Sequence, residues 1–492
     1  WGWEYGGEIS LSQGQHTLTF HDLTGFEGRF GLVVLTQDKN ITLPKTAEDV
    51  TTFCYASGNF LVPQDQGNFD LVVCGGGIAG ICASLSAARQ GLKVALVQDR
   101  PVVGGNNSSE VRVWLGGETH FEPFPGIGNI VAELEQAKTG HYGCTNRGEN
   151  YEDEKKLGLL KAEPNIALYL EHILTDVKME NQSIESVTVW AYKENKRKTL
   201  HAPLFLDCTG DATLGYLAGA DFEVTTNGHM GMTNCWYMEP TAKKQSFPEC
   251  PWAIDLKGID IPGRVGVKDV YGNEGEGSLG CWFWEGGCEH DPIAKAEYTR
   301  DLNLRAMYGA VDALKNHDHT YENYHLAHAS YIGGKRESRR LFGDIVMTKS
   351  DVYKGVTYPD SCVPSSWNFD VHYPDRRFYA AFHEGDAFLT KDYHERFRKP
   401  YFIPLRAMFS RNINNLFMAG RNISVSHDAL GTVRVMRTGG MMGEVIGYAA
   451  KLCRTYQCTP RELYQSHNDE LMAQLKAIPK ITSTHRLTNA GG

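Results

Sequence analysis

Three glycines with the spacing GxGxxG, Gly75, Gly77 and Gly80, form the pattern in this chain that points most directly to chemistry. Glycines so spaced permit a tight turn, let the backbone approach a pyrophosphate, and let a helix pack closely on a strand. The helix that follows favours an anion, because its free N–H groups and its dipole point at it. Apolar runs at 71–74 and 94–97 predict the flanking strands. The segment is therefore predicted to hold the pyrophosphate of a nucleotide.

The second strand of this βαβ unit ends in a departure from the common nucleotide-binding pattern. An acidic residue usually holds the ribose hydroxyls there, but this chain has Gln98, followed by Asp99 and Arg100. Glutamine can accept a ribose hydrogen bond without carrying a charge. We expect Gln98 to take this role, with Asp99 as the alternative.

Two further segments indicate which nucleotide binds. One apolar strand ends in a polar turn near residue 207, a second ends near residue 419, and a helix is predicted to begin near residue 439. A nicotinamide enzyme needs neither segment. The polar residues and glycines of interest in them are Thr209, Gly210, Asp211, Gly420, Arg421, Gly439 and Gly440.

Together these segments resemble the three-part signature of FAD-dependent oxidoreductases of the glutathione reductase-like superfamily. The stretches QDRPVVGGNNSSEVRV, GGKRESRRLFGD and LFMAGRNISVSHDALGTVRVMRTGG are similar to the FAD dependent oxidoreductase family that often accompanies bacterial carbohydrate degradation. The resemblance covers residues 68–455 and implies FAD as the cofactor. It implies contacts to FAD from Gly75, Gly77, Gly80, Gln98, Asp99, Arg100, Gly104, Gly105, Asn106, Thr209, Gly210, Asp211, Gly420, Arg421, Gly439 and Gly440. The helix opening at Gly439 would aim its dipole at the N1/C2 edge of the flavin and favour the reduced ring.

Composition limits the classes of partner. With 59 acidic against 49 basic residues the net charge is −10, and no long basic run occurs, so nucleic acid and anionic membranes are poor partners. Residues 71–88 carry no charge, but their three successive glycines and strand pattern argue against a membrane span. The expected partner is a small-molecule substrate of the carbohydrate class.

The twelve cysteines do not form a small disulfide scaffold, and no CxxC suggests a metal or a redox dithiol, so no metal is predicted. Cys281 with Cys288, and Cys453 with Cys458, could pair in an oxidising compartment. An extracytoplasmic (periplasmic) location is preferred over a cytoplasmic one.

The order of these patterns predicts an α/β fold: a doubly wound parallel FAD-binding sheet with β-rich substrate or lid insertions and a short N-terminal antiparallel β segment. Residues 8–36 alternate like strands of a sandwich and resemble the last strands of jelly-roll modules, with a β-hairpin decoration as the alternative. The predicted parts are a partial β-sandwich (1–41), a linker (42–67), a discontinuous FAD-binding domain (68–110, 200–221 and 403–456), a substrate and lid region (111–199 and 222–402) and a tail (457–492).

A flavin dehydrogenase needs a base for the hydroxyl proton, and histidine suits it because its free pKa lies near neutrality. His427 is the first candidate, since it follows Gly420 by seven residues; His229 is a weaker one. Arg336 and Arg434 are the candidate substrate-binding cations, although ion pairing within the protein is the alternative for Arg336. His372 and Tyr373 are expected at the surface, and His325 and His328 on one helix face as structural residues.

These residues predict a dehydrogenase or oxidase that removes hydride from a CH–OH group of a carbohydrate or sugar derivative. Trp282, Phe283, Trp284 and Trp367 could stack on sugar rings or pack a core. One alternative is a flavin-dependent C=C reductase or desaturase that acts next to a carbonyl. Another is a carbohydrate-binding protein with a vestigial flavin fold.

Overall fold

The computed structural model describes residues 2–21, 31–56, 62–136, 147–269, 272–375, 387–395 and 399–481. The chain divides into two compact units, Trp1–Val62 and Pro63–Gly492. In the first unit, residues 47–56 form α1 (Ala47–Ala56), while residues 2–21 and 31–46 form no strand. The strands predicted over 8–36 are therefore wrong for the described part; residues 22–30 lie outside it. The large apolar side chains in this part are exposed, so they do not form the buried face that a sheet of a sandwich needs.

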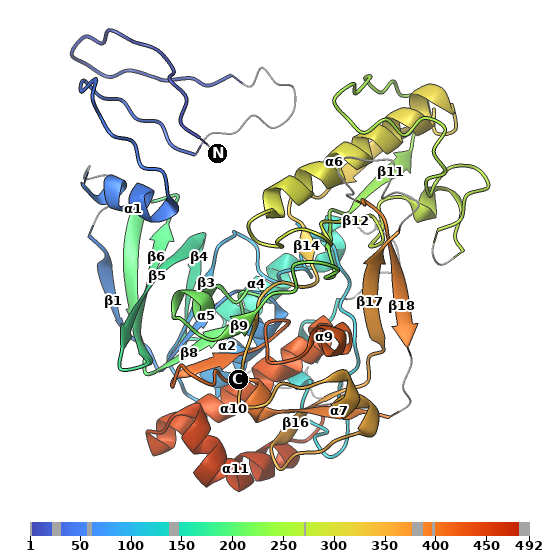
Figure 1. Cartoon of the computed structure of the whole chain (residues 1–492). Helices are drawn as coiled ribbons and strands as arrows, with labels where there is room; N and C mark the ends of the chain where they lie inside the picture. Colours follow the sequence, from blue (N-terminus) through green and yellow to red (C-terminus); the bar gives the residue numbers. More distant parts are fainter. Residues whose placement is uncertain are drawn as a thin grey trace. The chain divides into compact units, whose positions relative to one another are not determined.

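The core of the second unit is a five-stranded sheet in the order β20-β8-β2-β3-β4 (Figure 1). Its strands are all parallel and comprise β2 (Leu71–Cys74), β3 (Val94–Gln98), β4 (Ile166–Leu170), β8 (Leu204–Asp207) and β20 (Leu416–Met418). Every residue of β2, β3, β8 and β20 is buried, as continuous apolar runs in a doubly covered sheet require. The predicted α/β fold is confirmed. Residues 166–170, assigned from sequence to the lid region, belong to this sheet.

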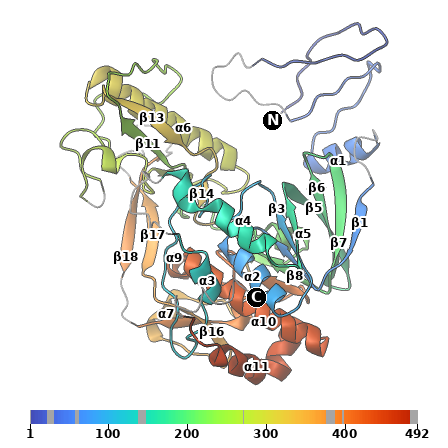
Figure 2. The ribbon, with the colours of Figure 1, turned by 180° about the vertical axis from the view of Figure 1, so that it is seen from behind.

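Two long helices pack against each other, α2 (Ile78–Arg89) and α10 (Met436–Tyr456) (Figure 2). A Cβ at Gly443 would lie 2.2 Å from the Ala79 carbonyl oxygen, and one at Gly447 would lie 2.3 Å from Ser86 Oγ. Glycine at both positions therefore lets the two backbones approach closely. The predicted helix at 439–448 is confirmed and extends in both directions.

A second sheet has the order β1-β7-β6-β5. It consists of β1 (Gln64–Asn68), β5 (His172–Glu180), β6 (Ser183–Ala191) and β7 (Lys196–His201). Since β1 pairs with β7 and α1 precedes it, the expected linker over 42–67 is in part regular structure. Residues 57–61 of that segment lie outside the described residues.

The described residues between 222 and 404, most of which were predicted to form a substrate and lid region, form short antiparallel sheets and one long helix. Its elements are β9 (Phe222–Glu223), β10 (Met232–Thr233), β11 (Trp236–Pro240), β12 (Glu285–Gly286), α6 (Ala296–Asp312), β13 (Tyr324–Ala329), β14 (Gly334–Lys335), β15 (Arg340–Leu341), α7 (Lys349–Lys354), β16 (Ser361–Ser365), β17 (Phe369–Pro374), β18 (Thr390–Glu395) and β19 (Tyr401–Pro404). His325 and His328 lie on strand β13, so the helix predicted for them is wrong. Burial and nearby Arg112 lower the pKa of His328 to about 4.

Other helices of the unit are α3 (Asn129–Glu133), α4 (Asp153–Lys161), α5 (Thr213–Leu217) and α9 (His427–Val433). Half of the residues predicted as a tail (457–492) form α11 (Pro460–Ala477), in which Leu463, Leu471 and Leu475 are fully buried, so the tail prediction is wrong there. Residues 482–492 lie outside the described part. Among the described residues, no helix combines the length and the apolar character that crossing a bilayer requires.

Candidate functional site

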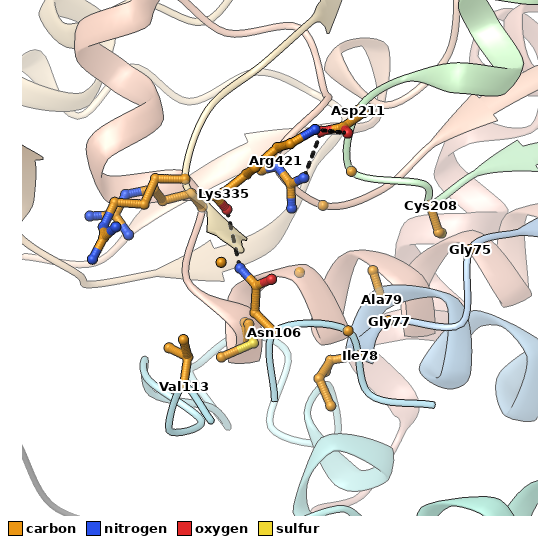
Figure 3. A pocket seen from close by; sticks show the side chains of 18 of the residues that line it. Gly75, Gly77, Ile78, Ala79, Asn106, Val113, Cys208, Asp211, Lys335 and Arg421 are labelled. Carbon is orange, nitrogen blue, oxygen red and sulfur yellow. Dashed lines mark hydrogen bonds and ion pairs between the residues drawn. The ribbon is translucent and has the colours of Figure 1, made fainter. Parts of the chain in front are cut away.

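A cavity of about 1160 Å³ opens at the carboxyl ends of β2, β3, β8 and β20 (Figure 3). The turns that follow these four strands all contribute to its lining, as expected for an open parallel sheet. Most of the predicted cofactor residues meet here: Gly75, Gly77, Gln98, Asp99, Arg100, Gly104, Gly105, Asn106, Thr209, Gly210, Asp211, Gly420, Arg421 and Gly439 line it.

The three motif glycines have different surroundings. A Cβ at Gly75 would lie 2.2 Å from the Cys208 carbonyl oxygen, and one at Gly80 would lie 1.9 Å from the Gly75 carbonyl oxygen. At Gly77 the nearest atom to a Cβ would be Gly105 Cα, at 3.9 Å. Gly75 and Gly80 are thus required by packing within the protein, and Gly80 does not line the cavity. Gly77 instead keeps the cavity open at the start of α2.

The N-terminus of α2 is available to an anion. No side chain caps it, its first turn carries no acidic residue, and Gly77, Ile78 and Ala79 all line the cavity. The N-terminus of α10 is similar: it has no side-chain cap, and Val435, Met436 and Gly439 line the cavity. Gly440 does not, because it faces Val131, whose Cγ2 would lie 2.5 Å from a Cβ.

Gln98 lines the cavity, but both ends of its side-chain amide are occupied. Its Oε1 accepts a 2.7 Å hydrogen bond from the Gly76 N–H, and its Nε2 donates to the Val102 carbonyl at 3.1 Å. Gln98 therefore stabilises the first glycine loop, Gly75 to Gly77. Asp99, whose side chain is 63% exposed, is the freer acceptor, and Arg100 is held by Glu110 at 2.6 Å.

Asp211 joins three segments at the cavity wall. Its carboxylate accepts hydrogen bonds from Lys335 Nζ at 2.6 Å and Arg421 Nη2 at 2.8 Å (Figure 3). Burial by itself raises the pKa of Asp211, but these two cations hold it well below its usual range. The carboxylate therefore stays charged, and the turns after β8 and β20 are fixed to each other and to β14.

The predicted catalytic residues separate into two groups. Arg336 and Arg434 line the cavity, whereas His427 and His229 do not. The Nδ1 of His427 lies 2.9 Å from Glu337 Oε2, and the ring nitrogens of His229 contact the backbone carbonyls of Met230 and His290. Both histidines thus join segments of the protein, contrary to the prediction that they contact substrate or flavin.

His372 was expected at the surface but is buried in the cavity lining. Its Nδ1 lies 2.6 Å from Oε2 of the fully buried Glu285, and its Nε2 lies 3.2 Å from Asp370 Oδ1. Thr390 Oγ1 donates to the same Glu285 oxygen at 2.9 Å, and Arg336 Nη1 lies 3.3 Å from it. Burial raises the pKa of Glu285, but Arg336 and His372 outweigh it and lower the pKa to about 2.

Aromatic and cationic side chains share the cavity lining with His372. Trp114, Trp282 and Trp367 line the cavity, and the rings of Trp114 and Trp367 lie 6.0 Å apart. Phe283 and Trp284, also expected as stacking candidates, are buried. Arg434 Nη2 lies 3.0 Å from Asp370 Oδ2. Trp367 and Arg434 were visible as candidates from sequence; Glu285 and Asp370 carried no signal there.

Comparison with known proteins identifies the family of this chain. Residues 70–477 match the model of the family described as FAD dependent oxidoreductase. The chain belongs to this family. The enzyme is an FAD-dependent oxidoreductase, so the alternative of a carbohydrate-binding protein without catalysis is not retained.

Individual relatives resemble this FAD-dependent oxidoreductase only in part. It is 44% identical over 54 residues to a glycerol-3-phosphate dehydrogenase of Mycobacterium leprae, a match of 11% of this chain and 9% of that protein. The FAD complex of the Bacillus halodurans glycerol-3-phosphate dehydrogenase matches 36% of this chain and 40% of its own, at 14% identity and a TM-score of 0.26. A geranylgeranyl bacteriochlorophyll reductase-like protein of Thermoplasma acidophilum matches 85% and 89%, at 12% identity and a TM-score of 0.39.

The residues present fit FAD. The space beside Gly77 that a Cβ would fill, and the two uncapped helix N-termini, are suited to a dinucleotide that carries negative charge. Bound FAD supplies the ability to accept a hydride. Among the described residues, no group of three or more His, Cys, Asp or Glu side chains is arranged to hold a metal ion.

Proposed function

We propose that the enzyme is a dehydrogenase that removes hydride from a CH–OH group of a carbohydrate or sugar derivative. The observation that carries this proposal is the His372–Glu285 contact of 2.6 Å, in a cavity whose lining also includes the glycine loops. Oxidation of an alcohol needs a group that takes the hydroxyl proton as hydride leaves. An imidazole held by a buried carboxylate is suited to that task.

The FAD would extend through the cavity from the glycine loops to α10. Gly77 and the N-terminus of α2 would hold the pyrophosphate, and Asp99 would reach the ribose. Gly420, Gly439 and the N-terminus of α10 would hold the flavin end. The cavity lining formed by Arg434, Trp367 and His372 then remains for the substrate.

Within that part, each group has a separate task. Glu285 can hold the proton on His372 Nδ1, and the hydroxyl proton would pass to Nε2, where Asp370 Oδ1 at 3.2 Å would stabilise the imidazolium that forms. Trp114 and Trp367 offer aromatic faces on which the C–H groups of a sugar ring can pack. Arg336 and Arg434 can orient hydroxyl or carboxylate oxygens. The short match to glycerol-3-phosphate dehydrogenases agrees with this reaction class.

The test is anaerobic mixing of the purified enzyme with a panel of sugars, sugar acids and polyols. Loss of the visible absorption of oxidised flavin with one of them supports the proposal. The H372N variant should then reduce its flavin about 100-fold more slowly, with unchanged FAD content. Y373F is the matched control, because Tyr373 is the next residue on β17 and is 44% exposed. Equal rates in H372N and the wild type would contradict the role of His372.

Arg434 favours the second candidate, a C=C reductase or desaturase that acts next to a carbonyl. This side chain lines the cavity, its Nε has no hydrogen-bond partner among the described residues, and burial lowers its pKa. A guanidinium in that state is a better proton donor than one in water. Turnover of enones or enoates with a reduced dye, lost in R434Q, would establish this candidate if no alcohol reduces the flavin.

A further inference from the structure

Lys156, on α4, is a charged residue whose side chain is fully buried. Its Nζ donates to the backbone carbonyls of Asn107 and Tyr151, both at 2.6 Å, and lies 3.4 Å from Asp153 Oδ1. Burial lowers the pKa of Lys156, and Asp153 opposes that effect. A lysine buried this completely is uncommon unless it is paired, so its partners define its purpose.

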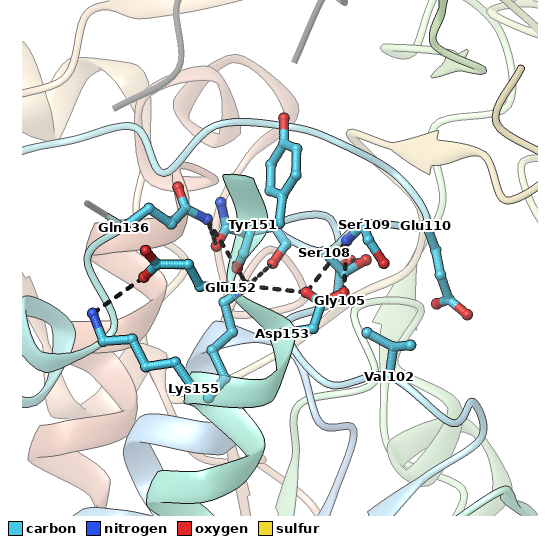
Figure 4. A network of polar contacts seen from close by, with 12 residues as sticks. Val102, Gly105, Ser108, Ser109, Glu110, Gln136, Tyr151, Glu152, Asp153 and Lys155 are labelled. Carbon is cyan, nitrogen blue, oxygen red and sulfur yellow. Dashed lines mark hydrogen bonds and ion pairs between the residues drawn. The ribbon is translucent and has the colours of Figure 1, made fainter. Parts of the chain in front are cut away.

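Of these partners, Asn107 belongs to the second glycine loop, residues 104–113, whereas Tyr151 lies just before α4 and Asp153 is its first residue (Figure 4). Asp153 also accepts from the Ser109 N–H, at 3.1 Å to Oδ2. Asn107 is itself fully buried, with Nδ2 donating to the Val113 carbonyl at 2.9 Å and Oδ1 accepting from Gln136 at 2.9 Å. One ammonium group thus fixes the loop to α4 from the side away from the cavity.

The front of the same loop lines the cavity. The Gly104 N–H donates to the Gly76 carbonyl at 2.7 Å, which joins the two glycine loops. A Cβ at Gly104 would lie 3.2 Å from Lys156 Nζ and 2.4 Å from the Asn107 carbonyl oxygen. The positive charge of Lys156 therefore lies directly behind the cavity wall, at the loop that faces the N-terminus of α2 across Gly77.

We propose that Lys156 is a positioning residue for FAD binding: it fixes the loop at 104–107 against the first glycine loop and places a cation behind it. No basic side chain stands in the first turn of α2 (Ile78, Ala79 and Gly80), so a charge behind Gly104 supplements the helix dipole toward the pyrophosphate. This inference rests on FAD binding and is independent of the donor, so failure of the sugar panel would leave it standing.

The experiment measures FAD binding to the apoprotein of the K156M variant by quenching of flavin fluorescence. Methionine is similar in length and removes the charge and the hydrogen bonds. We expect the Kd for FAD to rise about tenfold or more. K155M is the matched control, since Lys155 is the neighbour on α4 with a side chain 42% exposed, and its Kd should equal that of the wild type.

Thermal unfolding of each apoprotein separates positioning from general stability. If the K156M apoprotein binds FAD with the Kd of the wild type, the proposal is overturned, whatever its melting temperature. Should K156M fail to fold, K156Q provides the same test, because it removes the charge while its amide can still donate to one of the two carbonyls. K156Q should weaken FAD binding several-fold; an unchanged Kd in that variant would equally overturn the proposal.

Discussion

Asp211 and Arg421 lie 210 positions apart in the sequence, yet the carboxylate of one accepts a 2.8 Å hydrogen bond from the guanidinium of the other. With Lys335 they form a partly buried group in which one anion faces two cations. Because each residue comes from a different segment of the cavity wall, the geometry of the FAD site depends on this carboxylate.

The D211N variant should therefore lose both stability and FAD affinity. Two cations with side chains less than a fifth exposed would remain without their anion, which should lower the free energy of unfolding by about 2–3 kcal/mol. Urea unfolding measures the change. The exposed pair Asp221–Arg411 supplies the control, since D221N should cost less than about 1 kcal/mol.

Substitution of the motif glycines should separate cofactor binding from packing. Gly77 has φ −70° and open space around its Cβ position, so the G77A apoprotein should unfold within about 0.5 kcal/mol of the wild type yet bind FAD poorly. G80A places a Cβ 1.9 Å from a carbonyl oxygen and should lose about 2–3 kcal/mol. Urea unfolding and FAD titration of both variants test this, and a G77A protein that binds FAD normally would contradict the assignment.

The His427–Glu337 pair should act on stability in a pH-dependent way. The hydrogen bond to Glu337 raises the pKa of His427 above its usual 6.5. The pair thus stabilises the fold fully below pH 6.5, and its contribution is lost as the pH rises through the raised pKa. H427N should be less stable than the wild type at pH 6, and the difference should shrink in alkaline solution. A constant difference in urea midpoints across this range would refute the pairing.

Glu444 should produce the opposite kind of pH dependence to a paired carboxylate. It is buried on α10 and accepts from the N–H groups of Gly128 and Val131, both at 2.9 Å. Burial nevertheless raises its pKa from 4.5 to about 7. The folded state therefore binds more protons than the unfolded state between these values, so stability falls as the pH rises from 4.5 to 7. The E444Q variant should abolish this fall in stability between pH 4.5 and 7. The glutamine also loses one hydrogen-bond acceptor at every pH.

Most residues that line the cavity near the glycine loops could be predicted from the sequence, because the constraints on them are local. Gly75 and Gly80 are required by atoms within the same βαβ unit or its neighbouring strand, and apolar runs marked the buried strands. The lining around His372 could not be predicted in this way. His372 on β17 meets Glu285 on β12 across 87 positions, and no local pattern encodes that contact. His427 was chosen because it lies close to Gly420 in the sequence. Closeness in sequence does not predict which side chains line a cavity when strand pairing brings remote segments together.

The order of strands also bears on how the enzyme matures. The strand beside β8 is β20, which starts at Leu416, and the cavity is closed by the N-terminus of α10 at Met436. During synthesis the βαβ unit of β2, α2 and β3 emerges long before these partners. Until they arrive, one edge of β8 is unpaired and the apolar face that α10 covers is exposed to water. Capture of the prosthetic group must therefore await the late arrival of this region from the ribosome.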